Sequence, residues 1–144
     1  MKKKEQLLLQ HLRKNSRKSL TEISKETGVP VSTLFDTLKR LEANLITKHF
    51  SIVDFSKLGY SIKVNFVLSS KKKKELKAFL VQSQNVNSLS SLINGSDFFA
   101  ECIFKSLKDM TDFKSQLESF DISDMKEIFI IEDLKREGAL LPEN

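Results

Sequence analysis

The segment Ser19–Glu42, SLTEISKETGVPVSTLFDTLKRLE, constrains the fold of this chain more than any other part of its sequence. It predicts two short amphipathic helices joined by a tight turn at Gly28, because glycine tolerates the positive φ that ends many helices. Ser19 and Glu22 have the spacing of a capping box, in which each side chain bonds the backbone amide of the other residue. Pro30 has a fixed φ and no N–H, so it suits the first turn of the second helix. Together these signals predict a helix-turn-helix.

The second helix of this motif is expected over residues 31–43. Leu34, Leu38 and Leu41 recur at helical spacing and predict its buried stripe. The small polar residues of its first turn then lie on other faces, where a recognition helix contacts base edges and phosphates. Pairs of amphipathic helices with a glycine turn also occur in bundles that do not touch DNA, so this pattern alone leaves DNA binding open.

The flanking sequence extends the motif on both sides. A first helix over residues 3–15 is predicted by leucines at helical spacing, namely Leu8, Leu9 and Leu12. Asn44 is expected to end the recognition helix in a left-handed cap. Residues 46–50 and 51–53 are expected to form two short strands. Three helices followed by such a hairpin make a winged helix-turn-helix, which favours DNA binding.

The second half of the chain has a different pattern. Asn94-Gly95 is a strong hairpin signal, and strand and helix patterns alternate around it. The expected elements are a strand over 62–68, a helix over 71–83, strands over 86–93 and 98–104, a helix over 109–120 and a strand over 126–132. This βαββαβ order predicts a four-stranded sheet with two helices on one face. The apolar residues of 62–68 and 128–131 exceed what one face needs, so we expect a face-to-face homodimer.

Charge is distributed unevenly along the chain. Residues 1–60 contain 12 Lys and Arg against 6 Asp and Glu, a net charge of +6, whereas residues 61–144 have 12 against 13, a net charge of −1. This asymmetry is typical of a DNA-binding half joined to a neutral assembly half. The basic run Lys71–Lys74 is the exception, and it is either a solvated helix start or a contact to flanking DNA.

Enzymatic chemistry finds no support in the sequence. His11 and His49 are the only histidines, and neither has a partner at metal-ligand spacing. There is no phosphate loop, nucleophile elbow or dinucleotide fingerprint. Cys102 is the only cysteine and is expected in the core. We therefore expect no catalytic residues, no metal and no cofactor. No apolar run is long enough for a membrane helix and no signal peptide is visible, so a cytoplasmic location is expected.

The chain resembles the Lrp/AsnC family of transcriptional regulators. The family's wing and linker pattern, a Gly-Val-Ile followed by an Asp and a Leu-Gly-Tyr, is matched without a gap by Asn44, Leu45, Ile46, Asp54, Leu58, Gly59 and Tyr60. The stretches Ser32–Leu34 and Leu38–Glu42 also match. The resemblance implies an α+β protein in which a winged helix-turn-helix at 1–54 and a linker at 55–60 precede a ferredoxin-like domain at 61–144. That domain dimerises and often binds a small effector; whether the dimers build into higher oligomers is left open by the sequence.

The resemblance and the residue pattern together predict the contacts to double-stranded DNA. Base edges or the thymine methyl group would be contacted by Ser32, Thr33 and Phe35. Phosphates would be contacted by Lys39, Arg40 and Lys48, and by the start of the preceding helix at Ser19 and Thr21. Asp36 would repel phosphate unless it accepts a cytosine amino group.

Three features depart from the family. Thr37 occupies a position where the family often has a basic residue. The N-terminus lacks the usual acidic residues. The effector loop usually has two residues between Gly and Asp, and this chain has one. By resemblance, an amino-acid effector would bind at Asn94, Gly95, Ser96 and Asp97, whereas the alternative is a plain turn in which Asp97 caps its own backbone.

The sequence thus predicts a sequence-specific DNA-binding transcriptional regulator with a small effector. Two alternatives stay open. One is an architectural DNA-binding protein without sequence preference. The other is a small-molecule-binding assembly domain whose helix-turn-helix no longer reads DNA.

Overall fold

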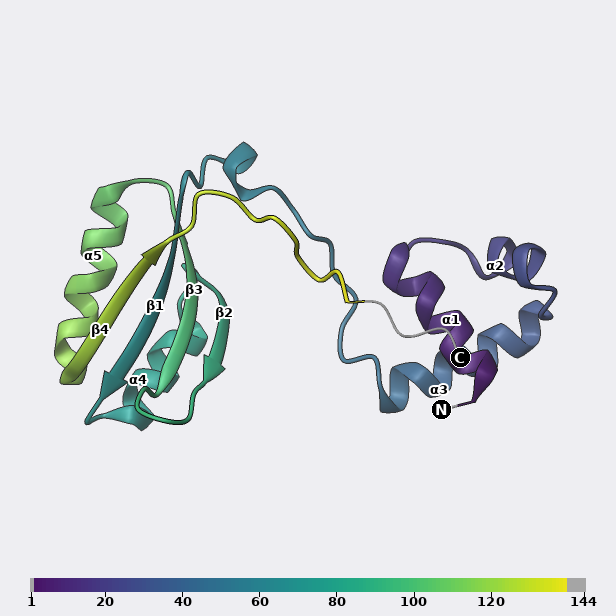
Figure 1. Ribbon diagram of the computed structural model, residues 1–144, viewed down its shortest axis with the longest axis horizontal. Coiled ribbons are helices and arrows are strands. Elements are labelled where there is room, and N and C mark those ends of the chain that lie inside the picture. The colour runs from purple at the N-terminus through teal and green to yellow at the C-terminus, as the bar shows by residue number, and fades with distance from the viewer. Residues whose placement is uncertain (1, 140–144) are drawn as a thin grey trace. The chain divides into compact units, whose positions relative to one another are not determined.

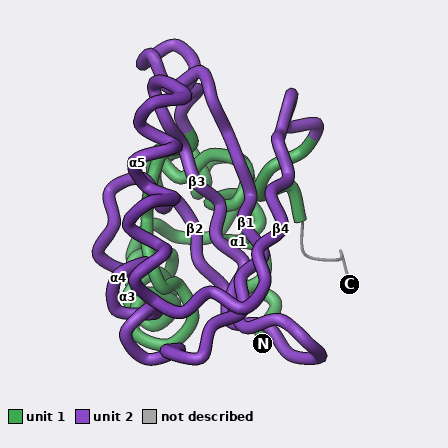
Figure 2. Tube along the Cα trace, turned by 90° about the vertical axis from the view of Figure 1, so that its left-hand side faces the viewer, with its two compact units in different colours: residues 1–52, 135–144 green, residues 53–134 purple. Residues whose placement is uncertain are grey.

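The computed structural model describes residues 2–139, which form two compact units. One unit contains residues 2–52 together with 135–139, and the other contains residues 53–134 (Figure 2). The chain therefore passes from one unit to the other twice. Each unit has its own apolar core, and each is described by itself.

The first unit contains three helices, α1 (Lys3–Lys14), α2 (Leu20–Thr27) and α3 (Val31–Asn44) (Figure 1). All three contribute to one small core, whose buried members are Leu8, Leu12, Ile23, Leu34 and Leu41. The leucine spacing in the sequence correctly predicted α1 and α3, because residues three and four apart share one side of a helix.

The turn of the helix-turn-helix has the predicted geometry. The hydroxyl of Ser19 accepts a hydrogen bond from the amide of Glu22 at 3.1 Å, and the amide of Ser19 donates to the Glu22 carboxylate at 2.8 Å. This capping box fixes the start of α2. Gly28 ends the helix in the left-handed region, with φ of +73°. Both predictions are confirmed.

The segment after α3 differs from the prediction. Asn44 is the last helical residue and its side-chain amide donates to the carbonyl of Arg40 at 2.8 Å, so it is not a left-handed cap. The helix is followed by Leu45 at φ −133°. The two strands expected over 46–50 and 51–53 do not form, and these residues have no regular structure. Ile46 packs on the helical core, but Phe50, Ile52 and Val53 are exposed. A two-stranded hairpin without a core to pack against is marginal.

Residues 135–139 rejoin the first unit at α1. The Arg13 guanidinium donates to the carbonyl of Ala139 at 2.8 Å and to the carbonyl of Glu137 at 2.9 Å. It also lies 3.5 Å from the Glu137 carboxylate. One arginine thus ties this C-terminal segment to the outside of the helical unit, an interaction that no sequence signal predicted.

The second unit confirms the βαββαβ order. Its elements are β1 (Ile62–Ser70), α4 (Lys73–Gln82), β2 (Val86–Ser91), β3 (Phe98–Phe104), α5 (Leu107–Leu117) and β4 (Ile122–Phe129). All paired strands are antiparallel, and the sheet order is β2-β3-β1-β4 (Figure 1). Short 3₁₀ turns at Phe55–Leu58 and Glu118–Phe120 precede β1 and follow α5.

One face of this sheet and both helices form the core of the second unit. Alternate residues of β1 and β3 pack against the helices. The centroid of the Phe113 ring lies 5.8 Å from that of Phe66 and 5.4 Å from that of Phe104. Cys102 is fully buried among them, and its burial raises the pKa of its thiol to about 12. It is the core residue that the sequence predicted.

The last strand lies earlier than predicted. β4 begins at Ile122 rather than residue 126 and ends at Phe129, so Ile131 lies outside the sheet and is fully exposed. Ile122 and Met125, at the start of β4, pack on the core. The strand was predicted later because residues 128–131 form a more continuously apolar run. The position of β4 is set by its pairing with β1, which includes a register shift at Ser69/Ser70.

Candidate nucleic-acid interface

The α3 helix separates its core-facing residues from its outward-facing ones. Leu34, Thr37 and Leu41 are buried against α1 and α2, with Leu38 partly buried beside them. The outward side chains are exposed and include four predicted site residues, Ser32, Phe35, Asp36 and Lys39, with Arg40 next to them. Thr33 is half-buried. The predicted base-reading residues therefore share one accessible surface.

Thr37 does not belong to that surface. Its exposed fraction is 0%, and its hydroxyl donates to the carbonyl of Thr33 at 2.7 Å. It lies three residues after Leu34 and four before Leu41, so it falls on the buried stripe. The absence of a basic residue at this position therefore removes no contact from the outward face.

Phe35 is the most conspicuous side chain of the outward face. Nearly half of it (48%) is exposed, and the Lys39 ammonium lies 4.6 Å from the centroid of its ring. Val31, one helical turn earlier, is 42% exposed. Val31 was not among the predicted site residues, although its position four residues before Phe35 places it on the same side of the helix.

Arg40 is held more firmly than Lys39. Its guanidinium lies 3.8 Å from the Glu5 carboxylate of α1 and donates to the Thr37 hydroxyl at 3.4 Å. A phosphate would have to compete with these partners for Arg40. Lys48 lies in the irregular segment after α3 and is exposed.

The start of α2 is partly occupied by its own capping box. The Glu22 carboxylate accepts hydrogen bonds from the Ser19 amide and hydroxyl, which hold the pKa of Glu22 below its ordinary value. A negative charge therefore already lies at the helix start. Of the two residues predicted to bind a phosphate there, Ser19 is committed to this cap, and Thr21 remains exposed.

The predicted effector loop lies between β2 and β3. Asn94 and Gly95 both have positive φ, at 68° and 111°, as a tight turn requires. The Asp97 carboxylate accepts from the Ser70 amide at 2.9 Å and from the Lys73 ammonium at 3.0 Å. The Ser70 amide is the main reason that the pKa of Asp97 lies below its ordinary value. Asp97 thus holds the end of β1 and the start of α4, rather than capping its own backbone.

The remaining predicted loop residue, Ser96, is half-buried.

Within the basic run before α4, Lys73 is paired with Asp97, and Lys72 lies 3.7 Å from the Asp121 carboxylate. These two lysines therefore have local carboxylate partners.

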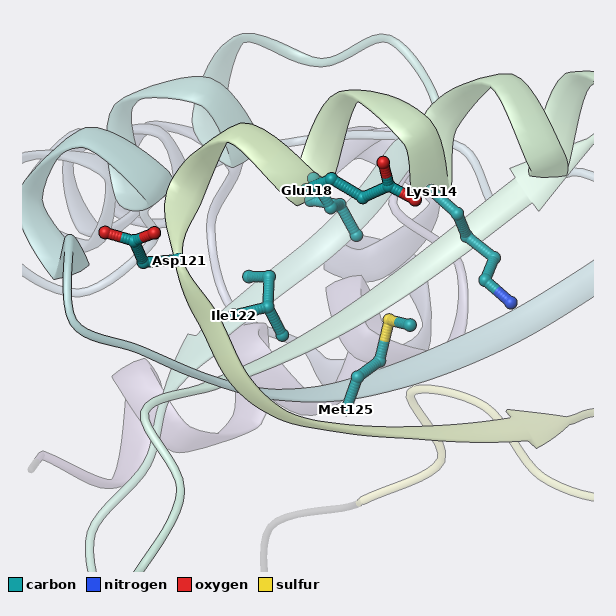
Figure 3. Close-up of a pocket in the computed structure, with 6 residues that line it drawn as sticks. Lys114, Glu118, Asp121, Ile122 and Met125 are labelled. Carbon is teal, nitrogen blue, oxygen red and sulfur yellow. The ribbon is translucent and has the colours of Figure 1, made fainter.

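A groove of about 300 Å³ lies elsewhere in the second unit, between the end of α5 and the start of β4. Ile122 and Met125 extend from β4 toward α5, while Lys114, Glu118 and Asp121 line the groove with charged groups (Figure 3). Lys114 forms an ion pair with Glu127. None of the four predicted effector-loop residues lines this groove.

Among the residues that the structure describes, no helix has the length and apolar character needed to cross a membrane.

Comparison with known proteins agrees with this architecture. Residues 1–44 match the family model described as winged helix-turn-helix DNA-binding. An uncharacterised HTH-type transcriptional regulator of Pyrococcus horikoshii is 23% identical over 137 residues, which cover 93% of each chain.

Two solved structures share the fold over nearly their whole length. A transcriptional regulator from Neisseria meningitidis in complex with L-Met superposes with a TM-score of 0.88 at 21% identity, covering 99% of this chain and 96% of that one. An AsnC family transcriptional regulator from Agrobacterium tumefaciens gives a TM-score of 0.85 at 14% identity, covering 98% and 97%. At these identities the likeness shows the fold.

Proposed function

We propose that this chain, which has the helix-turn-helix and ferredoxin-like fold of the Lrp/AsnC regulators, is a sequence-specific DNA-binding transcriptional regulator. The observation that carries the proposal is the outward face of α3. This second helix of a capped helix-turn-helix presents polar, basic and aromatic side chains on one accessible surface. We place it in the cytoplasm, where it would meet DNA.

The roles of the α3 residues follow from their exposure. Ser32, Thr33 and Phe35 lie in the first turns of the helix and would contact base edges in the major groove. Lys39 would contact a phosphate. Asp36 would accept a hydrogen bond from a base amino group, since phosphate repels it.

Further phosphate contacts would come from residues around α3. Lys48 would contribute one from the segment that follows the helix. Arg40 would contribute less than Lys39, because Glu5 and Thr37 already bind it. At the start of α2 the contact would fall to Thr21 more than to Ser19, whose amide and hydroxyl are taken by Glu22.

The protein would act as a homodimer through the sheet face that α4 and α5 leave open. Strand pairing places Val67 beside Phe99, and Asn65 between Glu101 and Ile128, on this face. The apolar members of this set would be buried by a second copy. Val67→Asp should then shift the sedimentation coefficient from dimer to monomer. A wild-type monomer at micromolar concentration would contradict the assembly.

Such a dimer would carry two recognition helices. They would enter successive major grooves on one side of the duplex, about one helical turn apart or a multiple of it. Pairs of dimers could assemble further.

An amino-acid effector is the natural candidate for the second unit, since the solved relative from Neisseria meningitidis binds L-Met. Asn94 and Gly95 are exposed and could contact such a ligand, while Asp97 is bound by Ser70 and Lys73. Calorimetric titration with the twenty amino acids would test this role. Heat from none of them would remove the effector from the proposal.

Sequence-specific reading is tested by selecting bound duplexes from a random pool and comparing their affinity with unselected DNA. A specific regulator should prefer the selected duplex by about a thousandfold or more. A ratio near one would instead indicate an architectural protein. Absence of binding even at low salt would leave only the second unit as the functional part.

A further inference from the structure

We propose that Phe35 recognises the 5-methyl group of thymine, so that α3 selects duplexes carrying thymine at a defined position of the major groove. The inference rests on the proposed DNA-binding function and names the base that this residue reads. Three properties of Phe35 point to this contact: its exposure, its apolar ring and the lysine beside it.

The exposure of Phe35 is not imposed by the core. Leu34 and Thr37 on either side of it are fully buried and already provide the packing to α1 and α2. Phe35 points away from them, and Val31 continues the apolar surface one turn earlier. A polar residue at position 35 would keep the helix and its core intact. The ring and Val31 therefore leave an apolar surface on α3 that is accessible to a partner.

A phenyl ring in the major groove has one apolar group to contact on the base edges. Guanine, cytosine and adenine present hydrogen-bond donors and acceptors there, whereas thymine adds its C5-methyl group. The ring has no donor or acceptor of its own. It can therefore distinguish base pairs only through the methyl group, by the presence or absence of an apolar contact.

The charges beside Phe35 favour DNA over an apolar protein surface as the occupant. The Lys39 ammonium lies 4.6 Å from the ring centroid, in the geometry of a cation–π interaction. A protein partner that covered the ring would also have to bury this ammonium. In the major groove, the same ammonium can reach a phosphate while the ring remains on the base. Phe35 thus also positions Lys39 for its phosphate.

The experiment replaces thymine by deoxyuridine, which keeps every hydrogen-bonding group and lacks only the methyl. Each thymine of a duplex selected from the random pool is replaced in turn, and binding is measured by fluorescence anisotropy. At one thymine position of a half-site, replacement by deoxyuridine should lower wild-type affinity by about fourfold, which corresponds to the loss of one buried methyl group. The same replacement should leave the affinity of Phe35→Ala unchanged.

Two further variants separate the contact from general effects. Phe35→Leu keeps an apolar side chain and should remain sensitive to deoxyuridine. It lacks the ring that forms the cation–π interaction with Lys39, so Lys39 should be less well positioned for its phosphate. Val81→Ala removes a similarly exposed apolar side chain (65%) from α4 of the second unit and should behave as wild type. Circular dichroism confirms that each variant is folded.

The outcomes are distinct. Wild-type binding that is indifferent to deoxyuridine at every position would overturn the inference and leave DNA binding standing. Equal sensitivity in wild type and Phe35→Ala would show that another residue reads the methyl group, and would overturn it too. Absence of wild-type binding to every duplex would refute the proposed function itself.

Discussion

Lys39→Ala offers a quantitative test of how α3 meets DNA. Lys39 is exposed and lies over the Phe35 ring, and within residues 2–139 it forms no ion pair, so its charge is available to a phosphate. Each neutralised phosphate contributes about 0.9 to the slope of log affinity against log salt. Loss of this one contact should therefore flatten the slope by about 0.9. The ratio of wild-type to variant affinity should therefore fall by roughly 3.5-fold between about 50 and 200 mM salt.

The assay is equilibrium binding of wild type and variant to one duplex over that salt range, by fluorescence anisotropy. Lys77→Ala on α4 removes the same charge from an exposed position of the second unit and should leave the slope unchanged. Arg40→Ala should flatten the slope less than Lys39→Ala, because Glu5 and Thr37 already bind Arg40. Parallel lines for wild type and Lys39→Ala would show that Lys39 does not contact phosphate.

Further predictions concern the scaffold. Gly28→Ala should destabilise the helical unit by about 1–2 kcal/mol in thermal unfolding, because an alanine at φ +73° is strained. The added methyl group meets no other atom, so no steric clash adds to this cost. Glu22→Gln should lower stability at neutral pH, and the difference from wild type should vanish in acid. The pKa of Glu22 is lowered on folding, so its contribution is present above about pH 4.5 and is lost as the pH falls through the folded value. The Cys102 thiol, with a pKa of about 12, should resist a thiol reagent until the protein unfolds. Arg13→Ala should speed tryptic cleavage after Lys135, because it removes the hydrogen bonds that hold residues 135–139; an unchanged rate would show that Arg13 does not hold this segment.

Much of the fold could be predicted because its signals are local. The Ser19–Glu22 spacing, Gly28 and the leucine repeats each reflect contacts within one helix or one turn, and they specify α1 to α3. The residue pattern typical of a strand and the Asn94-Gly95 turn likewise located β3 within the second unit. Such local signals survive in a single sequence because no distant partner is needed to interpret them.

The errors arose where contacts between residues far apart in the sequence determine the secondary structure. The start of β4 depends on its pairing with β1, and the local sequence points instead to the more apolar run at 128–131. The strands expected over 46–53 had suitable residues but no core to support them.

The candidate site was predictable in part for the same reason. Helical spacing placed Phe35 and Lys39 on the outward side of α3, where the structure has them. The burial of Thr37 was not predicted, because a threonine among leucines does not stand out as a core residue. Arg40 was expected to contact phosphate, and its ion pair with Glu5 could not be predicted because only the packing of α1 against α3 brings the two together. The binding of Asp97 to Ser70 and Lys73 likewise joins segments that are far apart in the sequence.

The central claim, that this chain is a sequence-specific DNA-binding regulator, is tested most directly by its binding to its own promoter region. Affinity for that fragment would be compared with affinity for a random duplex of equal length, at two salt concentrations. We predict preferential binding to the promoter that weakens steeply with salt. Equal affinity for both duplexes, or no binding to either at low salt, would contradict the claim.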